Sequence, residues 1–307
     1  MAVLRSAFIA LSHNRPLRRF VERSRLCSRL SSRFIAGMTL EDAMRVAAAV
    51  NREGISVTLD SLGESVTSEI EAHRAAEVYY QLLDAIAARK LDANISVKLT
   101  QMGLEQSPRL AEAIAAGLAQ RAHAYGNFVR IDMEDSALTQ VTLDIVRRLH
   151  ARADLRGSIG VVIQAYLYRS EADIEQLLAD GIRVRLCKGA YKEPPEVAFP
   201  RKADVDKNFV HLSGKLLDSH VYHGIATHDE NMIAAAKAFA KEHGIDSSRF
   251  EFQMLYGIRR DLQRKLVQDG YRVRVYVPFG PEWYPYVMRR MAERPANVIF
   301  LARNFFR

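Results

Sequence analysis

The chain has 307 residues, of which 49% are hydrophobic and 26% charged, which is typical of an ordinary globular protein and long enough for one large α/β domain. No apolar run approaches the ~18 residues that a membrane-spanning helix needs. The two cysteines, Cys27 and Cys187, lie far apart in the sequence, so they form neither a CxxC motif nor a disulfide framework. We therefore expect a reducing compartment.

The net charge of +8 is most conspicuous at the amino terminus. Residues 1–40 contain eight arginines and one acidic residue, Glu22. Such a segment is typical of a basic helical arm that contacts anionic lipid, or of a removable mitochondrial transit peptide, and we favour the arm. Because no RNA- or DNA-binding motif accompanies the charge, nucleic acid is not expected as a partner. We predict an N-terminal basic helical arm (1–40) and a catalytic domain (41–307), in a cytoplasmic protein with peripheral contact to the inner membrane.

Apolar segments rich in β-branched residues alternate with segments of helical periodicity. The first helix should begin near Thr39, because Thr39 and Asp42 have the spacing of a capping box. Helical periodicity is also found at residues 111–124, 138–149, 234–242 and 262–267. Eight strands are predicted at residues 55–59, 95–99, 128–132, 160–164, 182–186, 224–228, 250–254 and 271–276. Eight strand–helix units favour a closed α/β barrel of the (β/α)8 TIM type, whereas five or six would favour an open, doubly wound sheet.

Polar side chains stand near the ends of these strands, which is the active-site face of such barrels. Inward positions of a barrel normally hold Val, Ile or Leu, so this many polar groups on one rim would cost heavily in desolvation unless they bind a ligand. The excess of lysine and arginine indicates an anionic ligand, either a phosphate or a carboxylate. The rim residues are Asp60, Lys98, Asp132, Gln164, Arg185, Lys188, Thr227, His228, Gln253 and Tyr276.

Two adjacent arginines, Arg289 and Arg290, precede Glu293 on a predicted last helix. Neighbours on a helix diverge by about 100°, but both could reach one small anion if the helix lies over the barrel mouth. On its own, the motif is more typical of a solvated helix face with an i,i+4 ion pair. The nine histidines show no zinc-binding spacing, and the chain has no GxGxxG, GxxxxGK[ST], GxSxG or HExxH motif, so no metal is expected.

Eight short strings carry a resemblance to a known family. They are DSLGES (60–65), SVKLTQMGL (96–104), VRIDMEDS (129–136), VVIQAYLYR (161–169), RLCKGAYKEP (185–194), ATHDE (226–230), FEFQMLYG (250–257) and YVPFGPEWYPYVMRRMAER (276–294). In this order, from about residue 35 to the C-terminus, they resemble the proline dehydrogenase family. The resemblance is to its short monofunctional bacterial members, which the N-terminal arm fits more loosely.

The resemblance implies an enzyme that oxidises L-proline to Δ1-pyrroline-5-carboxylate, the first step of proline catabolism, in a distorted barrel. It implies that Lys98, Arg289 and Arg290 hold the substrate carboxylate, which would orient the ring for hydride transfer. Glu293 and Asp132 would balance these charges, and Asp132 would act as a catalytic acidic residue that orients Lys98.

Two further roles follow from the resemblance. Tyr276 would pack on the proline ring and leave little room for a ring hydroxyl, which favours proline over hydroxyproline. Glu64 would pair with Arg289 as a gate that closes the site over the substrate and excludes water.

The resemblance also implies non-covalent FAD, with the substrate C5 hydride moving to flavin N5. A cation beside N5 and N1 would stabilise the arriving negative charge, which makes Arg185 catalytic as well as cofactor-binding. Electrons would pass to a quinone, and a separate pyrroline-5-carboxylate dehydrogenase would consume the product. The implied cofactor contacts are Met133, Gln164, Arg185, Lys188, Gly189, Ala190, Thr227 and His228.

The residues alone leave other functions open. A barrel lyase or aldolase could use Lys98 as a Schiff-base amine on a phosphate-bearing substrate. A barrel could also only bind an anionic ligand or a partner protein. A dehydrogenase for another cyclic imino acid, such as hydroxyproline, is a variant of the main interpretation.

Overall fold

The structure, a computed structural model, describes residues 33–63 and 66–293, with side chains to Met288. Its eight strands run parallel and close into a barrel in chain order, because β8 pairs with β1. The strands are β1 (Ser56–Ser61), β2 (Ala93–Val97), β3 (Val129–Ile131), β4 (Ile159–Gln164), β5 (Arg183–Cys187), β6 (His223–Ala226), β7 (Phe250–Leu255) and β8 (Arg272–Phe279). Each predicted strand overlaps one of them, so the predicted TIM-type barrel is confirmed.

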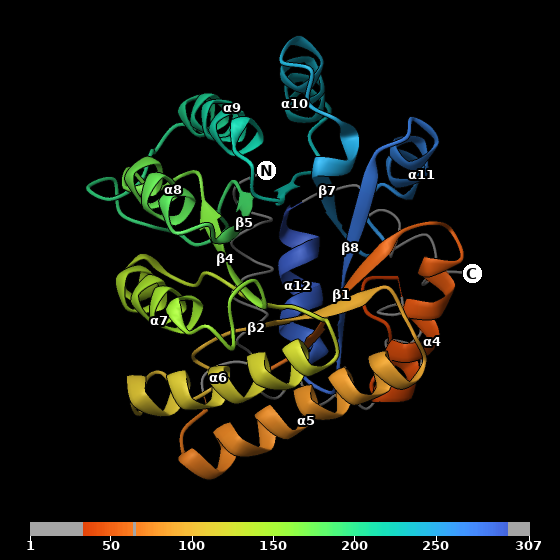
Figure 1. Cartoon of the computed structure of the whole chain (residues 1–307), viewed down its shortest axis with the longest axis vertical. Helices are drawn as coiled ribbons and strands as arrows, with labels where there is room; N and C mark the ends of the chain where they lie inside the picture. The colour runs from red at the N-terminus through yellow and green to blue at the C-terminus, as the bar shows by residue number, and fades with distance from the viewer. Residues whose placement is uncertain (1–32, 64–65, 294–307) are drawn as a thin grey trace.

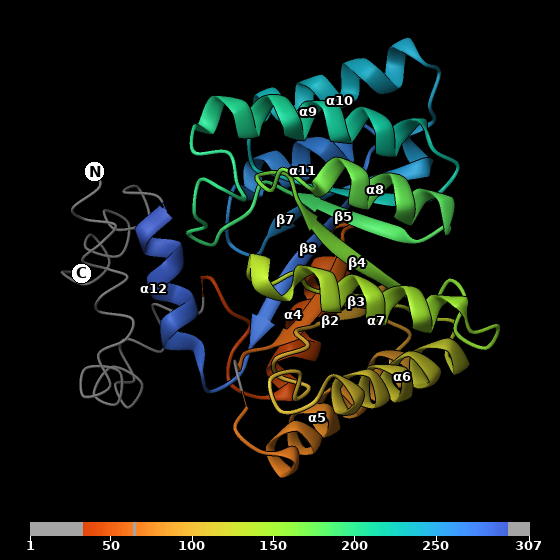
Figure 2. The ribbon, with the colours of Figure 1, turned by 90° about the vertical axis from the view of Figure 1, so that its left-hand side faces the viewer.

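Eight helices surround the barrel, and a ninth lies apart from them among the described residues (Figure 1). The surrounding helices are α4 (Leu40–Asn51), α5 (Glu69–Ala88), α6 (Pro108–Ala124), α7 (Thr139–Ala151), α8 (Ser170–Ala179), α9 (Lys202–Asp218), α10 (Glu230–Glu242) and α11 (Arg260–Gln268). The ninth, α12 (Trp283–Glu293), follows β8. It crosses the centre of the ring in Figure 1 and lies beyond the end of β8 in Figure 2, so it covers the mouth of the barrel.

The start of α4 is fixed by the predicted capping box. Thr39 accepts a hydrogen bond from the Asp42 backbone N–H at 3.1 Å, and Asp42 accepts one from the Thr39 N–H at 3.1 Å. These bonds satisfy two donors that a helix start otherwise leaves unpaired. Just before the cap, Phe34 and Ile35 are buried in a cluster with Trp283 at the start of α12. Most of the predicted arm (1–40) lies outside the described residues and stays a prediction.

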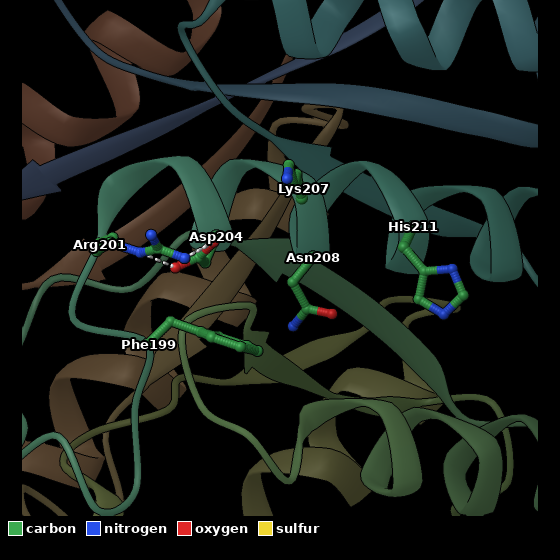
Figure 3. A pocket seen from close by; sticks show the side chains of 6 residues that line it. All are labelled: Phe199, Arg201, Asp204, Lys207, Asn208 and His211. Carbon is green, nitrogen blue, oxygen red and sulfur yellow. Dashed lines mark hydrogen bonds and ion pairs between the residues drawn. The ribbon is translucent and has the colours of Figure 1, made fainter.

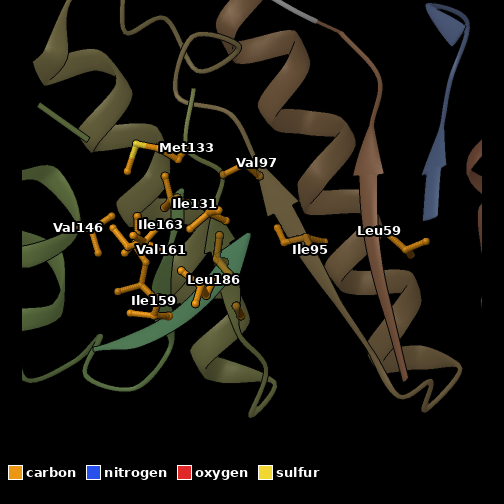
Figure 4. Packing of buried hydrophobic residues seen from close by; sticks show 14 of the residues in the cluster. Leu59, Ile95, Val97, Ile131, Met133, Val146, Ile159, Val161, Ile163 and Leu186 are labelled. Atoms are coloured by element: carbon orange, nitrogen blue, oxygen red, sulfur yellow. The ribbon is translucent and has the colours of Figure 1, made fainter. Parts of the chain in front are cut away.

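The two faces of the strands differ sharply in chemistry. Outward residues such as Leu59, Val97 and Ile163 are apolar and form the main core beneath the helices (Figure 4). Inward residues such as Arg130 and Glu251 are polar although they are buried. The sequence indicated polar groups only at the rim. The structure extends them down the interior, where ion pairs and hydrogen bonds replace the usual aliphatic layers.

Candidate active site

Asp132, directly after β3, is the centre of the polar ring at the barrel mouth. Its Oδ1 accepts hydrogen bonds from Ser96 Oγ at 2.5 Å and from Arg185 NH1 at 3.0 Å. Its Oδ2 accepts one from the Tyr276 hydroxyl at 3.0 Å. Four strands, β2, β3, β5 and β8, are thereby joined through one carboxylate. The structure brings together three of the predicted site residues, Asp132, Arg185 and Tyr276.

Tyr276 lies against Arg185 as well as Asp132, with the Arg185 guanidinium 5.3 Å from the centre of the Tyr276 ring. Burial and the negative charges of Asp132 and Asp60 raise the pKa of Tyr276 well above its ordinary value. The phenol therefore stays protonated and acts as a donor. An aromatic ring fixed in this way can form one wall of a substrate pocket.

Lys98, directly after β2, pairs with Asp60 of β1 through Nζ and Oδ2 at 3.2 Å. Asp60 is 1% exposed, and its Oδ1 accepts a hydrogen bond from the Tyr79 hydroxyl of α5 at 3.0 Å. The direct partner of Lys98 is thus Asp60 and not Asp132, which was expected to orient it. Burial lowers the pKa of Lys98, but the negative charges of Asp60 and Asp132 outweigh burial and raise the pKa above its ordinary value.

Lys188, which follows β5, belongs to a second, more exposed cluster. Its ammonium contacts Asp206 of α9 at 2.5 Å and Asp229 at 2.8 Å, and Lys202 also pairs with Asp206. The charges of two lysines and two aspartates balance in this cluster. An ammonium has three N–H donors, so two carboxylates leave one for a phosphate oxygen.

Three more of the predicted cofactor residues, Gln164, Thr227 and His228, lie at or just after the ends of β4 and β6. Gln164 is 3% exposed and donates to the Glu134 carbonyl at 2.8 Å. Thr227 accepts from the Asp229 N–H at 3.1 Å, and His228 Nε2 accepts from the Leu255 N–H at 2.8 Å. These contacts hold the ends of β4, β6 and β7 in place.

Met133 and Gly189, two of the predicted cofactor contacts, both lie against side chains of the protein itself. The Met133 side chain is buried in the core with Val146 of α7 (Figure 4), so only its backbone can meet a ligand at the mouth. Gly189 has a φ of +110°, and a Cβ there would lie 2.2 Å from the Tyr166 ring. The positive φ and the close contact with Tyr166 each require glycine at position 189, whether or not a ligand is bound. Ala190, the next residue, is exposed.

The remaining predicted residues are Glu64, Arg289, Arg290 and Glu293. Glu64 and the other three side chains lie outside the described residues, so their roles as gate and substrate ligands stay predictions. The backbone of α12 is described, and it covers the barrel mouth, which is the position that convergence of the two arginines requires (Figures 1 and 2).

Sequence reasoning gave no role to several residues that the structure places in the site. Ser96 and Glu251 each precede a rim residue by two positions, and the period of two along a strand could have identified them. Asp229 directly follows His228 in the string ATHDE. Asp206, by contrast, lies in the middle of a helix with no local signal. The full set of added residues is Tyr79, Ser96, Asp206, Asp229, Glu251 and Arg274.

A surface pocket beside α9 is separate from this ring (Figure 3). It brings together none of the predicted site residues. Its lining residues are Phe199, Arg201, Asp204, Lys207, Asn208 and His211. Among the side chains that the structure describes, no group of three or more His, Cys, Asp or Glu could hold a metal ion. No helix within residues 33–63 and 66–293 is long and apolar enough to cross a membrane.

Comparisons with known proteins agree with this geometry. The profile of the proline dehydrogenase family matches residues 43–303. Proline dehydrogenase 1 of Bacillus subtilis subsp. natto is 43% identical over 99% of this chain and 100% of its own length. Proline dehydrogenase of Deinococcus radiodurans is 41% identical over 91% of this chain and 90% of its own length.

Among solved structures, proline utilization A from Bdellovibrio bacteriovorus, inactivated by N-propargylglycine, superposes with a TM-score of 0.82 and 27% identity. The match covers 87% of this chain and 33% of that longer one. The bifunctional PutA of Escherichia coli is 27% identical over 89% of this chain and 24% of its own length. The family profile and the full-length relatives together show that this chain is an oxidoreductase that belongs to the proline dehydrogenase family.

Proposed function

We propose that this chain oxidises L-proline to Δ1-pyrroline-5-carboxylate and that the polar ring around Asp132 is its active site. The observation that carries the proposal is the buried Arg185 guanidinium, held at the barrel mouth by Asp132 and lying against Tyr276. A fixed cation beside an aromatic wall suits the transfer of a hydride, because negative charge arrives where the guanidinium already stands.

The residues of the mouth fit FAD, on which the family depends. Arg185, Lys188, Gln164 and Thr227 supply hydrogen-bond donors from β4, β5 and β6, which is the chemistry that an isoalloxazine ring and a pyrophosphate require. FAD, when bound, supplies the acceptor of the hydride. We assign Arg185 to the flavin ring, and we assign Lys188 and Thr227 with His228 to the pyrophosphate and ribose oxygens.

We assign the substrate carboxylate to Lys98, Arg289 and Arg290. Asp60 holds the Lys98 ammonium at 3.2 Å with one carboxylate oxygen, which leaves other N–H donors of the ammonium for the substrate carboxylate. The position of α12 over the mouth suits the two arginines, whose planar forks match a carboxylate. Glu293 would balance the added positive charge, and the Glu64–Arg289 pair would close the site and exclude water.

The binding pose places the proline ring against Tyr276. Proline reacts with a neutral ring nitrogen, so that the nitrogen lone pair can form the C=N bond as the C5 hydride leaves. The Tyr276 hydroxyl is already used by Asp132 at 3.0 Å, which holds the phenol ring in one orientation. A fixed ring at van der Waals distance from the substrate favours proline over its hydroxylated analogue.

The pKa of Lys98 argues against the Schiff-base alternative. An amine that forms a Schiff base must lose its proton, which enzymes achieve by lowering the pKa. The charges of Asp60 and Asp132 shift the pKa of Lys98 in the opposite direction, even though burial lowers it. Lys98 therefore acts as a fixed cation that binds an anion.

The electron acceptor and the partners complete the proposal. We propose that a quinone accepts the electrons. We also propose that this protein is cytoplasmic and contacts the membrane peripherally through its basic segment 1–40. A separate pyrroline-5-carboxylate dehydrogenase would consume the product.

The visible spectrum of the purified protein under anaerobic conditions tests the activity. We expect the absorption of oxidised flavin, which bleaches when L-proline is added and does not bleach with an acyclic amino acid. Borohydride added together with substrate should leave Lys98 unmodified, as measured by mass spectrometry. A colourless protein that does not take up FAD, or a flavin that L-proline fails to bleach, would overturn the proposal.

A further inference from the structure

Gln253 of β7 is the second side chain that holds Arg185. Its Oε1 accepts a hydrogen bond from Arg185 Nε at 2.5 Å, whereas Asp132 accepts from NH1 of the same guanidinium. Gln253 is 5% exposed and Arg185 is 6% exposed, so water does not compete for this bond. Asp132 and Ser96 accept from NH1, the latter at 3.3 Å, and Gln253 accepts from Nε, so bonds at both nitrogens fix the plane of the guanidinium.

Glu251 determines which end of the Gln253 amide faces Arg185. Gln253 Nε2 donates to Glu251 Oε1 at 2.5 Å, and a carboxylate can only accept in this bond. Because the amide nitrogen is held there, the amide oxygen must face the guanidinium. The two neighbours therefore select the same one of the two amide orientations.

Glu251 is itself held as a carboxylate. Arg274 Nε contacts its two oxygens at 2.8 and 3.0 Å, and the Tyr222 hydroxyl donates to Oε2 at 3.0 Å. Burial raises the pKa of Glu251, but the charge of Arg274 and the hydrogen bonds of Arg274, Gln253 and Tyr222 outweigh burial and lower the pKa. In the hydrogen-bonded series Arg274–Glu251–Gln253–Arg185, every donor therefore faces an acceptor.

β6, which lies between β5 and β7, leaves space for this hydrogen-bonded series. Gly224 of β6 is in register with Arg185 on one side and with Glu251 on the other. A Cβ at Gly224 would lie 2.3 Å from Gln253 Nε2 and 2.7 Å from its Cδ. The missing side chain on β6 therefore lets Gln253 reach across β6 to a strand that is not its neighbour.

We propose that Gln253 is the positioning residue for Arg185 and that Glu251 fixes the amide orientation in which it does so. The inference rests on the proposed function, because the role of Arg185 toward the flavin is part of it. Gln253 does not meet the substrate in this assignment. It acts through Arg185, so its loss should change the properties of the flavin only while Arg185 is present.

A double-mutant cycle on the holoenzyme tests the proposal, with the flavin midpoint potential and the rate of anaerobic flavin reduction by L-proline as measurements. We expect Gln253→Met to slow flavin reduction by about 10- to 100-fold, the range for loss of a hydrogen bond to a charged group, with little change in the proline concentration at half-saturation. The midpoint potential should become more negative, by about 30 mV for each tenfold loss in stabilisation of the reduced form. In the Arg185→Met background, Gln253→Met should have no further effect on either measurement.

Two other variants keep the test informative if Gln253→Met binds flavin poorly. Glu251→Gln should shift the potential in the same direction but by less. An amide at position 251 can donate as well as accept, so only Arg185 would still select the orientation of the Gln253 amide. Asn51→Ala is the structural control, because Asn51 makes three hydrogen bonds to backbone groups at the opposite end of the barrel. It should lower the melting temperature and leave the potential unchanged.

The outcomes separate the inference from the function on which it rests. If L-proline bleaches the wild-type flavin, but Gln253→Met and Glu251→Gln both keep the wild-type potential and reduction rate, the positioning role is wrong and the function stands. Equal shifts with Arg185 present and with Arg185 replaced by methionine would also refute it. A wild-type flavin that L-proline does not bleach would instead refute the function.

Discussion

Two arginines inside the barrel, Arg185 near the mouth and Arg130 near the floor, have opposite surroundings. Arg185 is held by the carboxylate of Asp132 and the amide of Gln253. Arg130 donates to the carbonyls of Val161 at 3.0 Å and Arg183 at 2.6 Å, and within the described part of the chain its Nε has no partner. Burial, together with the nearby charge of Arg185, lowers the pKa of Arg130 well below its ordinary value.

The difference between the two surroundings separates the arginine to which we assign a catalytic role from one that has only a structural role. The guanidinium of Arg185 is matched by the carboxylate of Asp132 at 3.0 Å, and the proposed function places it where negative charge would arrive. Arg130 instead fills volume: it lies 4.7 Å from the centre of the Phe128 ring and closes the floor of the barrel with backbone acceptors. Arg274 resembles Arg185, because each guanidinium pairs with a carboxylate: Arg274 with Glu251, and Arg185 with Asp132.

The largest expected effect is on stability, when Arg274 is replaced. Arg274→Met leaves Glu251, which is 4% exposed, without its cation, and breaking a buried pair on one side costs about 3–5 kcal/mol of unfolding free energy. Arg130→Met should cost less than ~1 kcal/mol or even stabilise, because a desolvated guanidinium with no carboxylate partner among the described residues is removed. Urea denaturation at neutral pH measures both. The comparison fails if Arg130→Met proves the more costly change.

The next effect is on catalysis. Arg185→Met should lower the rate of flavin reduction by L-proline by about 10²–10³-fold, the loss typical of one fixed group that stabilises developing negative charge. Arg183→Met is the matched control from the same strand, since Arg183 stacks on Phe128 at 5.3 Å and Tyr222 at 6.0 Å and makes no ion pair with a described residue. It should leave the reduction rate within about twofold, as measured by anaerobic stopped flow. Similar losses of reduction rate in both variants would contradict the difference in role between the arginine at the mouth and the arginines at the floor.

The sequence predicted the barrel well because the outer faces of the strands carry a strong local signal. Segments such as 160–164 and 250–254 are rich in β-branched or aromatic residues, and the intervals between the predicted strands leave room for one helix each. The capping box at Thr39 is also local, as both partners lie within four residues. Such features depend on neighbours in the chain, so they can be predicted from the sequence.

The partners inside the barrel were harder to predict because they depend on register. Asp132 was expected to orient Lys98, but Asp60 is the direct partner of the ammonium. The period of two places all three residues on the inner face, and only the stagger of neighbouring strands decides which carboxylate the ammonium meets. The cluster of Lys188 with Asp206 depends on how α9 lies against β5, which no local pattern records.

The smallest effect concerns the floor and its response to acid, through His223 of β6. Its Nδ1 accepts from the Val184 N–H at 3.0 Å, and burial, followed by the charge of Arg130, lowers the pKa of His223 to about 3. The folded state then keeps this imidazole neutral, whereas the unfolded chain binds a proton below about pH 6.5. The unfolded state therefore gains protons first, so stability falls as the pH drops from about 6.5 toward 3 and is unaffected by this group above that window.

His223→Asn tests this assignment, because the amide oxygen can still accept from Val184 but does not titrate. Between pH 6.5 and 5.5 the wild type should lose about 1 kcal/mol of unfolding free energy through this group, and the variant should lack that loss. His73→Gln is the control, since the His73 side chain is 59% exposed and its ion pair with Glu69 lies at the surface. Parallel pH profiles for the wild type and His223→Asn would mean that the buried ring titrates freely. The floor would then be open to water and would not be the dry, closed counterpart of the mouth.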